Sequence, residues 1–254
     1  MTNLIDLSGK NAIVTGGSRG VGRATAMLLA KAGANVGISY RARADEATAT
    51  VNDLHQLGVS AWAEAGDLTD PAAAAGLFAR AATEWDGVDI VVVNHGIWPV
   101  PDVAIADMDA ERWKRTLDVN LNAAFYVCQE AARALRNDGR LVIITSTAAQ
   151  RGEAFHADYA ASKGALVSLV KGFCVELAPR GITVNSVAPG WIDTEMAAPA
   201  MQGPERSAIE ARIPIGRVAS ADDIAGPVVF LASALARHIT GEIVNVNGGA
   251  VLVG

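Results

Sequence analysis

The chain has 254 residues and a formal net charge of −6, and 51% of its residues are hydrophobic while 19% are charged. So much apolar material can form a large core, which argues against a disordered chain, and the acidic balance argues against non-specific nucleic-acid binding. No apolar run reaches about 18 residues, so no transmembrane helix is expected, and the N-terminal stretch "MTNLIDLSGK" has no secretory-signal pattern.

The cysteines and histidines show no metal-binding pattern. Cys128 and Cys174 lie in separate apolar helical patterns, and the four histidines are scattered along the chain. We therefore expect buried free thiols, as is usual in the reducing cytoplasm, and no metal site.

Short β-rich runs alternate with longer helical patterns along the whole chain. This alternation predicts right-handed crossovers and a parallel sheet with helices on both faces. The strands are apolar along their length, as is typical of strands buried on both faces. We predict a single α/β domain over residues 1–254, with a Rossmann-type doubly wound sheet of about seven strands and ligands beyond their carboxyl ends. The predicted strands are 11–15, 35–40, 60–65, 89–94, 140–146, 182–188 and 242–247, and the predicted helices span about 20–32, 43–57, 71–85, 107–136, 157–178 and 222–234.

A glycine-rich turn, "TGGSRGVG", follows the first predicted strand and opens the first helix. Gly16, Gly20 and Gly22 allow a tight turn and a close backbone approach, and the amide groups and dipole of the helix N-terminus favour an anion. The spacing differs from G-x-G-x-x-G, but its place in the first βαβ unit indicates a site for a dinucleotide phosphate. The alternative is a glycine turn that binds no ligand.

The second predicted strand ends at Tyr40 and Arg41, where a site for NAD usually has an acidic residue for the ribose 2′-hydroxyl. Arg19, in the glycine turn, is expected in the same space. Guanidinium groups without a carboxylate favour a 2′-phosphate, so the sequence predicts NADP(H) rather than NAD(H). The alternative is that Arg41 and Arg43 are ordinary surface side chains.

Polar residues also follow the third and fourth predicted strands. Asp67 is either an acceptor for the adenine amino group or a helix cap, a role for which Asp70 is better placed. Asn94 and Gly96 suit a close backbone pass beside the cofactor. His95, between them, is expected to line the cleft rather than to act as a catalytic base.

Tyr159 and Lys163 are four residues apart at the start of a predicted helix, so they share one helix face. The lysine ammonium and a positive nicotinamide ring are expected to lower the tyrosine pKa by roughly 2–3 units from its usual value near 10, or ~3–4 kcal/mol. Tyr159 would then exchange a proton with a carbonyl oxygen as hydride moves. The alternative is a surface Tyr/Lys pair.

Two further polar residues are expected to work with this pair. Ser146 ends the fifth predicted strand, 13 residues before Tyr159, and its hydroxyl is expected to hold the substrate oxygen. Asn120 lies in an apolar helical pattern, where a buried amide needs a polar partner. We expect Asn120 either to hold a water for Lys163 or to bond its own helix.

Taken together, the motifs resemble the classical short-chain dehydrogenase/reductase family. The matching pieces are "TGGSRGVG", "DLTD", "VNHG", "DVNLNA", the serine before "YAASK", and "VNSVAPGWIDT", which appear in family order over nearly the whole chain. The resemblance implies a catalytic tetrad that acts on a carbonyl or CH–OH group, with residues Asn120, Ser146, Tyr159 and Lys163. The residues implied for NADP(H) binding are Thr15, Gly16, Ser18, Arg19, Gly20, Val21, Gly22, Tyr40, Arg41, Asp67, Leu68, Asn94, Gly96, Tyr159, Lys163, Pro189, Gly190, Ile192 and Thr194.

The chain departs from the family at "VNHG", where N-N-A-G is usual, so His95 is expected to alter the substrate cleft or the local structure. The family does not fix the substrate. The chain is most like bacterial 3-oxoacyl-[acyl-carrier-protein] reductases, and the alternatives are a sugar or secondary-alcohol dehydrogenase and a non-enzymatic NADP(H)-binding redox sensor. The segment 191–214 is expected to be a substrate loop or lid. Large side chains expected either in an apolar cleft or in the core are Trp98, Phe155, Trp191 and Met196.

Partner predictions rest on surface residues. Four arginines form either a basic patch for an acyl carrier protein or a solvated surface, namely Arg133, Arg136, Arg140 and Arg180. The helices at 107–136 and 157–178 carry apolar residues on more than one face, which predicts a dimer or tetramer. The family is usually tetrameric, so a homotetramer is expected.

Overall fold

Seven short apolar strands form the centre of the molecule, which a computed structural model describes over residues 4–252. All neighbouring strands pair in parallel, in the order β3-β2-β1-β4-β5-β6-β7. The order reverses between β1 and β4, so a crevice opens beyond the carboxyl ends of these two strands. The predicted doubly wound sheet is confirmed. The strands are β1 (Asn11–Val14), β2 (Asn35–Tyr40), β3 (Ala61–Ala65), β4 (Val88–Val93), β5 (Leu135–Ile144), β6 (Thr183–Pro189) and β7 (Ile243–Val246).

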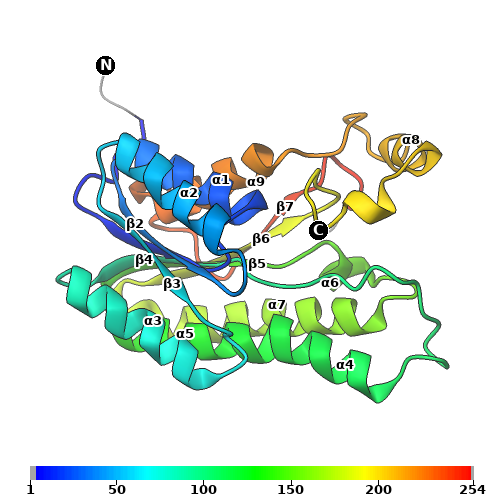
Figure 1. Ribbon diagram of the computed structural model, residues 1–254, viewed down its shortest axis with the longest axis horizontal. Helices are drawn as coiled ribbons and strands as arrows, with labels where there is room; N and C mark the ends of the chain where they lie inside the picture. Colours follow the sequence, from blue (N-terminus) through cyan, green and yellow to red (C-terminus); the bar gives the residue numbers. More distant parts are fainter. Residues whose placement is uncertain (1–3, 253–254) are drawn as a thin grey trace.

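Helices cover both faces of this sheet (Figure 1). On one face lie α1 (Gly20–Lys31), α2 (Ala44–Gln56) and α9 (Ala221–Ala232), and on the other lie α3 (Pro71–Glu84), α4 (Ala110–Leu117), α5 (Ala123–Ala134) and α7 (Ala157–Leu177). Leu29, Leu54 and Ile224 are fully buried on the first face, and Leu77 and Leu166 are nearly so on the second. Each such side chain stabilises the fold by about 1.5–3 kcal/mol, so the two apolar layers fix the sheet and its ends.

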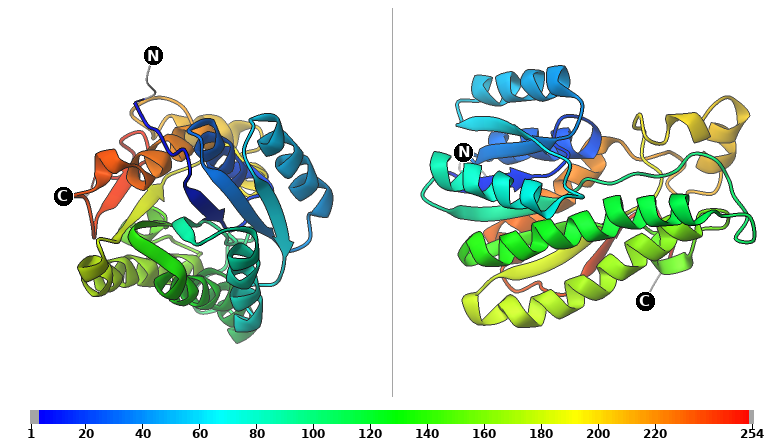
Figure 2. Two further views of the ribbon diagram at one scale, coloured as in Figure 1. Left: turned by 90° about the vertical axis from the view of Figure 1, so that its left-hand side faces the viewer. Right: turned by 60° about the horizontal axis from the view of Figure 1, so that its bottom comes forward.

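The helix predicted over 107–136 is broken in the structure. It consists of α4, a π-helical turn (Asp118–Asn122) and α5, and β5 begins at Leu135 rather than at residue 140. The three pieces run on as one nearly continuous helix beside α7 in the right-hand view of Figure 2. The π turn adds a residue to the helical repeat and so turns Asn120 inward, where it is fully buried.

The segment 191–214 is anchored by its own contacts. Ile192 pairs with Ala219 in an isolated β-bridge, and Met201, Ile213 and Val218 form a small apolar cluster. The segment holds a short 3₁₀ turn (Ala198–Ala200) and α8 (Pro204–Glu210) and passes across the carboxyl edge of the sheet (Figure 1). The two remaining 3₁₀ turns are Ala178–Arg180 and Ala234–Ala236, and a one-turn helix, α6, spans Ala148–Arg151.

Candidate functional site

A cavity of about 440 Å³ runs along the carboxyl ends of the strands. Three predicted residues, Thr15, Gly22 and Asn120, lie behind its wall rather than on it. The predicted residues that line it are Gly16, Ser18, Arg19, Gly20, Val21, Tyr40, Arg41, Asp67, Leu68, Asn94, Gly96, Ser146, Tyr159, Lys163, Pro189, Gly190, Ile192 and Thr194. The structure thus brings together residues from the whole length of the chain, and their binding roles stay predictions.

The glycine turn forms one wall of this cavity. Gly20 has a φ of +52°, which favours glycine, and a Cβ on Gly22 would lie 2.2 Å from the Gly16 carbonyl oxygen. Within helix α1, no side chain caps the N-terminus and no acidic residue lies in the first turn. The N-terminus of α1 lines the cavity through Gly20 and Val21 and, without a side-chain cap, suits an anion such as a cofactor phosphate.

Thr15 and its neighbours hold the turn against the end of β4. The Thr15 hydroxyl oxygen accepts from the Asn94 N–H at 2.9 Å, and the Asn94 side chain donates to the Thr15 carbonyl at 3.0 Å. Nδ1 of His95 lies 2.8 Å from the same hydroxyl. Burial and the Lys163 charge lower the pKa of His95 to about 3, so its ring is neutral and serves as part of this brace.

Asp67 does not cap the following helix. Its carboxylate accepts from the backbone and hydroxyl of Thr69, and these bonds, with the backbone one foremost, lower the pKa of Asp67. The cap of α3 is Asp70, which accepts from the Ala72 N–H at 2.9 Å, with Pro71 in the first turn. Asp67 therefore stays beside the cavity as one of its lining groups.

Asn120 binds the chain that follows β4. Its side-chain oxygen accepts from the Ile97 N–H at 2.7 Å, and its amide donates to the Ile97 carbonyl at 2.9 Å and to the Ser162 hydroxyl at 3.1 Å. A Cβ on Gly96 would lie 3.1 Å from the Asn120 side-chain oxygen and 3.5 Å from the Lys163 ammonium nitrogen. Asn120 thus fixes the backbone beside Lys163 by direct hydrogen bonds to Ile97. The alternative expected from the sequence, a side-chain bond to its own helix, is not what the structure shows.

Tyr159 and Lys163 lie one turn apart on α7 beside Ser146, which follows the end of β5 by two residues. The Lys163 side chain is only 5% exposed, and its ammonium nitrogen donates to the Ile144 carbonyl at 2.9 Å. Burial lowers the pKa of Lys163 to about 8. The phenol and the ammonium therefore share the inner end of the cavity, as the i, i+4 spacing predicts.

The pKa of Tyr159 moves in the direction opposite to the one expected from the sequence. Loss of water around the phenol raises its pKa to about 12, hydrogen bonding with Ser146 lowers it in part, and the charge of Glu153 raises it further. Burial is the largest cause of this rise, and the charge of Lys163, whose ammonium bonds the Ile144 carbonyl, is not among its causes. The lower pKa predicted for Tyr159 depended in part on the positive charge of a nicotinamide ring, which belongs to a cofactor and not to the protein chain.

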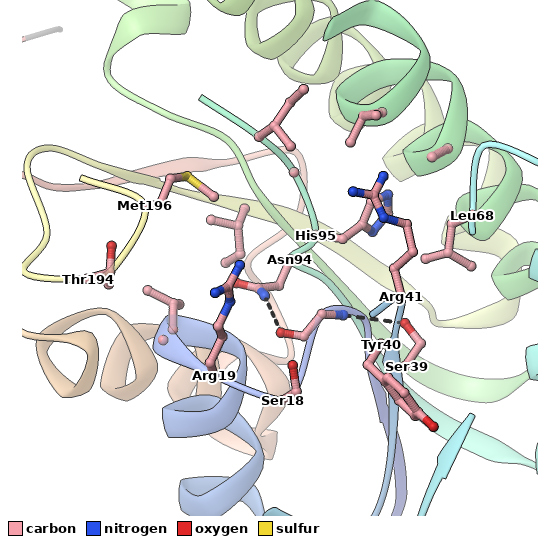
Figure 3. Close-up of a pocket in the computed structure, with 18 of the residues that line it drawn as sticks. Ser18, Arg19, Ser39, Tyr40, Arg41, Leu68, Asn94, His95, Thr194 and Met196 are labelled. Atoms are coloured by element: carbon pink, nitrogen blue, oxygen red, sulfur yellow. Dashed lines mark hydrogen bonds between the residues drawn. The ribbon is translucent and has the colours of Figure 1, made fainter. Parts of the chain in front are cut away.

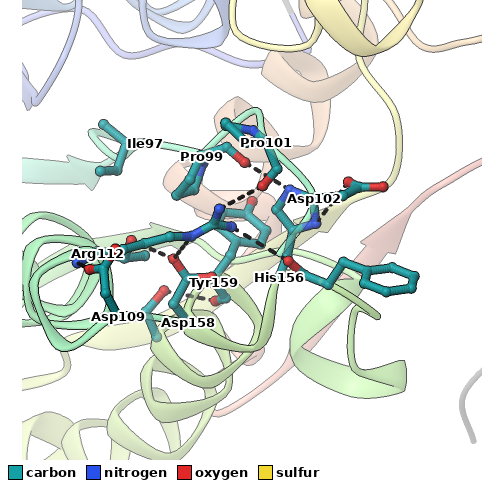
Figure 4. A network of polar contacts seen from close by, with 12 residues as sticks. Ile97, Pro99, Pro101, Asp102, Asp109, Arg112, His156, Asp158 and Tyr159 are labelled. Atoms are coloured by element: carbon teal, nitrogen blue, oxygen red, sulfur yellow. Dashed lines mark hydrogen bonds and ion pairs between the residues drawn. The ribbon is translucent and has the colours of Figure 1, made fainter. Parts of the chain in front are cut away.

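A buried ion pair next to the tyrosine was missed by the sequence analysis (Figure 4). The Arg112 guanidinium of α4 donates to the Asp158 carboxylate of α7 at 3.2 Å, and the Thr116 hydroxyl donates to it at 2.7 Å. Burial alone would raise the pKa of Asp158, but these hydrogen bonds outweigh it and lower the pKa. Because Asp158 is fully buried and precedes Tyr159, the pair fixes the first turn of α7.

Beyond Tyr159 lies a smaller cavity of about 110 Å³, in the place expected for the substrate. Trp98, Trp191 and Met196 line it, as the sequence suggested, but Phe155 is 54% exposed and lies outside its wall. Its charged pair, Arg151 and Glu153, was not predicted from the sequence.

Glu153 is an acidic residue on the wall of this cavity. Its side chain is only 15% exposed, and its carboxylate pairs with the Arg151 guanidinium at 3.1 Å. Burial raises the pKa of Glu153, while the Arg151 and His156 charges act in the opposite direction. The cleft therefore offers both a carboxylate acceptor and a guanidinium donor to a substrate that reaches Tyr159.

Three arginines stand at the opposite, outer end of the larger cavity, and Figure 3 shows Arg19 and Arg41 from two different elements. Each arginine has a carboxylate partner. Arg41 lies 3.7 Å from Asp67, and Arg43 lies 2.9 Å from Glu46. Arg19 pairs with Glu195 of the segment after β6, a contact that the sequence analysis did not foresee.

The four arginines considered for a carrier protein lie at the other end of the sheet. Arg136 and Arg140 are the second and sixth of the ten residues of β5, whereas Ser146 lies two residues beyond its last residue. Arg180 donates to the carbonyls of Ala132 and Leu135, and Arg136 pairs with Asp86 and Asp89. A carrier protein docked over these arginines would face away from Tyr159.

Over residues 4–252, no group of three or more acidic, histidine or cysteine side chains is arranged to hold a metal ion. In the same part of the chain, no helix is long and apolar enough to cross a membrane.

Known proteins match this chain over nearly its whole length. The sequence model of a family described as enoyl-(acyl carrier protein) reductase matches residues 16–251. The L-rhamnose 1-dehydrogenase (NAD(P)(+)) of Sphingomonas sp. (strain SKA58) is 38% identical over 247 residues, which cover 96% of both chains. The 3-oxoacyl-[acyl-carrier-protein] reductase FabG of Escherichia coli (strain K12) is 38% identical over 251 residues, or 98% of this chain and 100% of that protein.

The fold is also shared with solved structures. A short-chain dehydrogenase from Burkholderia cenocepacia J2315 in complex with NADP is 40% identical and superposes with a TM-score of 0.90, covering 96% of this chain and 98% of the other.

Proposed function

The chain belongs to the short-chain dehydrogenase/reductase family, and we propose that it is an NADP(H)-dependent oxidoreductase acting on a carbonyl or secondary alcohol. One observation carries the proposal: Ser146, the Tyr159 phenol and the buried Lys163, one helical turn from Tyr159, line the same cavity as the glycine turn.

Each member of this group has a role that its contacts support. The Ser146 hydroxyl holds the reacting oxygen, and Tyr159 gives that oxygen a proton or removes one. Lys163 brings a cation to the inner end of the cavity, and Asn120 holds the backbone at Ile97 beside it. A nicotinamide cofactor, when bound, supplies or accepts the hydride.

The residues around the cavity fit such a cofactor. The glycine turn and the uncapped N-terminus of α1 suit the pyrophosphate, and a nicotinamide is expected beside Pro189, Gly190, Ile192 and Thr194, which line the same cavity. We propose NADP(H) over NAD(H) because Arg19, Arg41 and Arg43 gather at the outer end. A related structure contains NADP, and a related dehydrogenase is named for both cofactors.

For the substrate we propose a ketone or a 3-oxoacyl thioester, in line with the FabG relatives, and a sugar as the second candidate. Glu153 favours the sugar. An acyl chain covering this carboxylate would remove water from it without supplying a hydrogen bond, which is unfavourable, whereas sugar hydroxyls donate to it. Trp98 and Trp191 add aromatic faces against which a sugar ring packs.

Initial rates on a small panel test both candidates. The panel comprises NADPH oxidation with acetoacetyl-CoA and with 2,3-butanedione, and NADP⁺ reduction with L-rhamnose and with tetrahydropyran-2-ol, each repeated with NADH or NAD⁺. Tetrahydropyran-2-ol keeps the pyranose lactol but lacks the other hydroxyls. If sugars are the substrates, L-rhamnose or another aldopyranose is preferred to it, and Glu153→Gln raises KM for the sugar roughly tenfold while leaving tetrahydropyran-2-ol unaffected.

The same panel separates the remaining alternatives. Preference for acetoacetyl-CoA, unchanged by Glu153→Gln, selects the thioester. NADPH binding without turnover of any member would instead support a redox sensor and contradict the proposed activity.

We also propose a cytoplasmic homotetramer. Trp113 on α4, Phe125 on α5 and Val175 on α7 are apolar side chains that stay 38%, 38% and 72% exposed on one helical layer. Light scattering after gel filtration gives the oligomeric state, and a monomer would contradict this part of the proposal.

A further inference from the structure

Glu195 places a carboxylate among the arginines at the outer end of the cofactor cavity. It forms an ion pair with Arg19 from the start of α1 and lies 3.6 Å from the Arg43 guanidinium before α2. The carboxylate is carried by the segment after β6 and lines the cavity together with both arginines. Three segments far apart in the sequence thus meet at one negative charge.

A carboxylate and a phosphate use the same guanidinium donors. A phosphate monoester carries a charge of about −1.5 to −2 and three acceptor oxygens, so it competes well for arginines held by a single carboxylate. The Glu195 side chain is 63% exposed, and exposed ion pairs contribute little stability, so its contacts are easily exchanged.

Glu195 differs in position from the other carboxylates in this cluster. Glu46 is carried by the first turn of α2, three residues after Arg43, and Asp67 follows β3 and lines the cavity. Glu195 instead follows Thr194, whose methyl carbon would lie 3.6 Å from a Cβ on Gly20. A ligand that binds Arg19 and Arg43 in place of Glu195 therefore breaks contacts of the segment 191–214, which passes beside the glycine turn at Gly20.

We propose that Glu195 is a residue that determines cofactor specificity by occupying the site of the 2′-phosphate. The proposal rests on the NADP(H) binding argued above. A cofactor with a 2′-phosphate must displace Glu195 from Arg19 and Arg43, whereas one with a free 2′-hydroxyl leaves the pairs in place. Glu195 therefore makes the preference for NADP(H) over NAD(H) weaker than the arginines alone would make it. The contacts of the segment 191–214 also change when a 2′-phosphate binds.

Binding of two cofactor fragments tests this without turnover. Adenosine 2′,5′-bisphosphate and adenosine 5′-monophosphate differ only in the 2′-phosphate, and calorimetry gives Kd for each with the full chain. Glu195→Gln is expected to tighten the bisphosphate roughly two- to fivefold, which is the size of an exposed ion pair, and to leave the monophosphate unchanged. The matched control is Glu205→Gln, because Glu205 is an exposed acid on the same segment that is absent from this cavity.

Hydrogen exchange over 191–214 supplies a second readout. In the wild type the bisphosphate is expected to change exchange in this segment more than the monophosphate does, and in Glu195→Gln the two ligands are expected to act alike. Equal effects of Glu195→Gln and Glu205→Gln on the bisphosphate Kd, or weaker binding in Glu195→Gln, would overturn the proposal. If the wild type binds both fragments equally but Glu195→Gln prefers the bisphosphate, the NADP(H) preference fails and the role of Glu195 stands.

Discussion

The two ends of the cofactor cavity are built in different ways. At the inner end, Lys163 and Asn120 are almost fully buried, and each bonds a defined backbone group. At the outer end, Arg19 and Arg41 are about half exposed and pair with carboxylates on loops. The inner end therefore holds chemistry in a fixed geometry, and the outer end holds charges that a ligand can exchange.

This difference has an energetic consequence. Buried charges interact in a low effective dielectric, so changing one partner has large effects, whereas exposed pairs contribute about 0–1 kcal/mol and are screened by salt. We therefore expect substitutions at the inner end to abolish activity and substitutions at the outer end to shift cofactor preference. Three experiments test this contrast.

The largest effect is expected from Tyr159→Phe, which removes the hydroxyl and little else. Losing the acid–base group is expected to lower kcat by ~100- to 10,000-fold. NADPH binding, measured by fluorescence titration, should change less than about twofold because the contacts of the glycine turn remain.

Tyr126→Phe is the matched control, since Tyr126 lies on α5 and is absent from the cavity lining. It should retain full activity. Turnover that persists in Tyr159→Phe would show that another group donates the proton.

A smaller effect is expected in the pH dependence of stability through Lys163. Its folded pKa is about 8, below the ordinary value of 10.5, so between these pH values the unfolded chain binds more protons than the folded one. Stability from this group therefore rises with pH over that window and is lost as pH falls toward 8. In urea unfolding without cofactor, the free energy of unfolding of the wild type minus that of Lys163→Met should increase by roughly 2 kcal/mol from pH 8 to pH 10.

Tyr159 does not interfere below pH 10. Its folded pKa, about 12, lies above the ordinary value of 10, so its contribution is lost only as pH rises beyond 10. Lys171→Met, on the exposed side of the same helix, is the control and should give a constant difference from the wild type. A constant difference in Lys163→Met as well would mean that Lys163 stays protonated in the folded protein.

Six of the seven strands and five of the six predicted helices agree with the structure within one or two residues, because apolar runs and turn residues mark them. The break at Asp118–Asn122 was not predicted, since no glycine or proline marks it, and the contact of its Asn120 with Ile97 joins residues 23 positions apart. The early start of β5 at Leu135 was missed for a similar reason, because contacts with the distant Arg180 accompany the end of α5.

In the candidate site, too, the residues marked by local sequence were predicted and the contacts between distant segments were not. Motif residues such as Ser146, Tyr159 and Lys163 stand near strand ends or one helical turn apart, so their spacing, together with the family resemblance, indicated that they lie close together. Arg19 and Glu195 are 176 positions apart, and a surface glutamate in a loop carries no local signal of its partner. Contacts of this kind, and the direction of the Tyr159 pKa, depend on packing between segments.

The smallest effect is expected at the outer end, from Arg41→Asp. The reversed charge repels a 2′-phosphate and stands beside Asp67, so Kd for NADPH should rise about tenfold, or ~1.4 kcal/mol, while Kd for NADH changes less than about twofold. Because the group is half exposed, raising the salt to about 0.5 M should shrink the NADPH effect.

Arg80→Asp on α3 makes the same change in net charge at an exposed site that pairs only with Glu84 among the described residues, so it should leave both constants unchanged. Equal Kd ratios for NADPH and NADH in Arg41→Asp and the wild type would exclude Arg41 from phosphate binding and leave Arg19 and Arg43 as the groups that could select the cofactor.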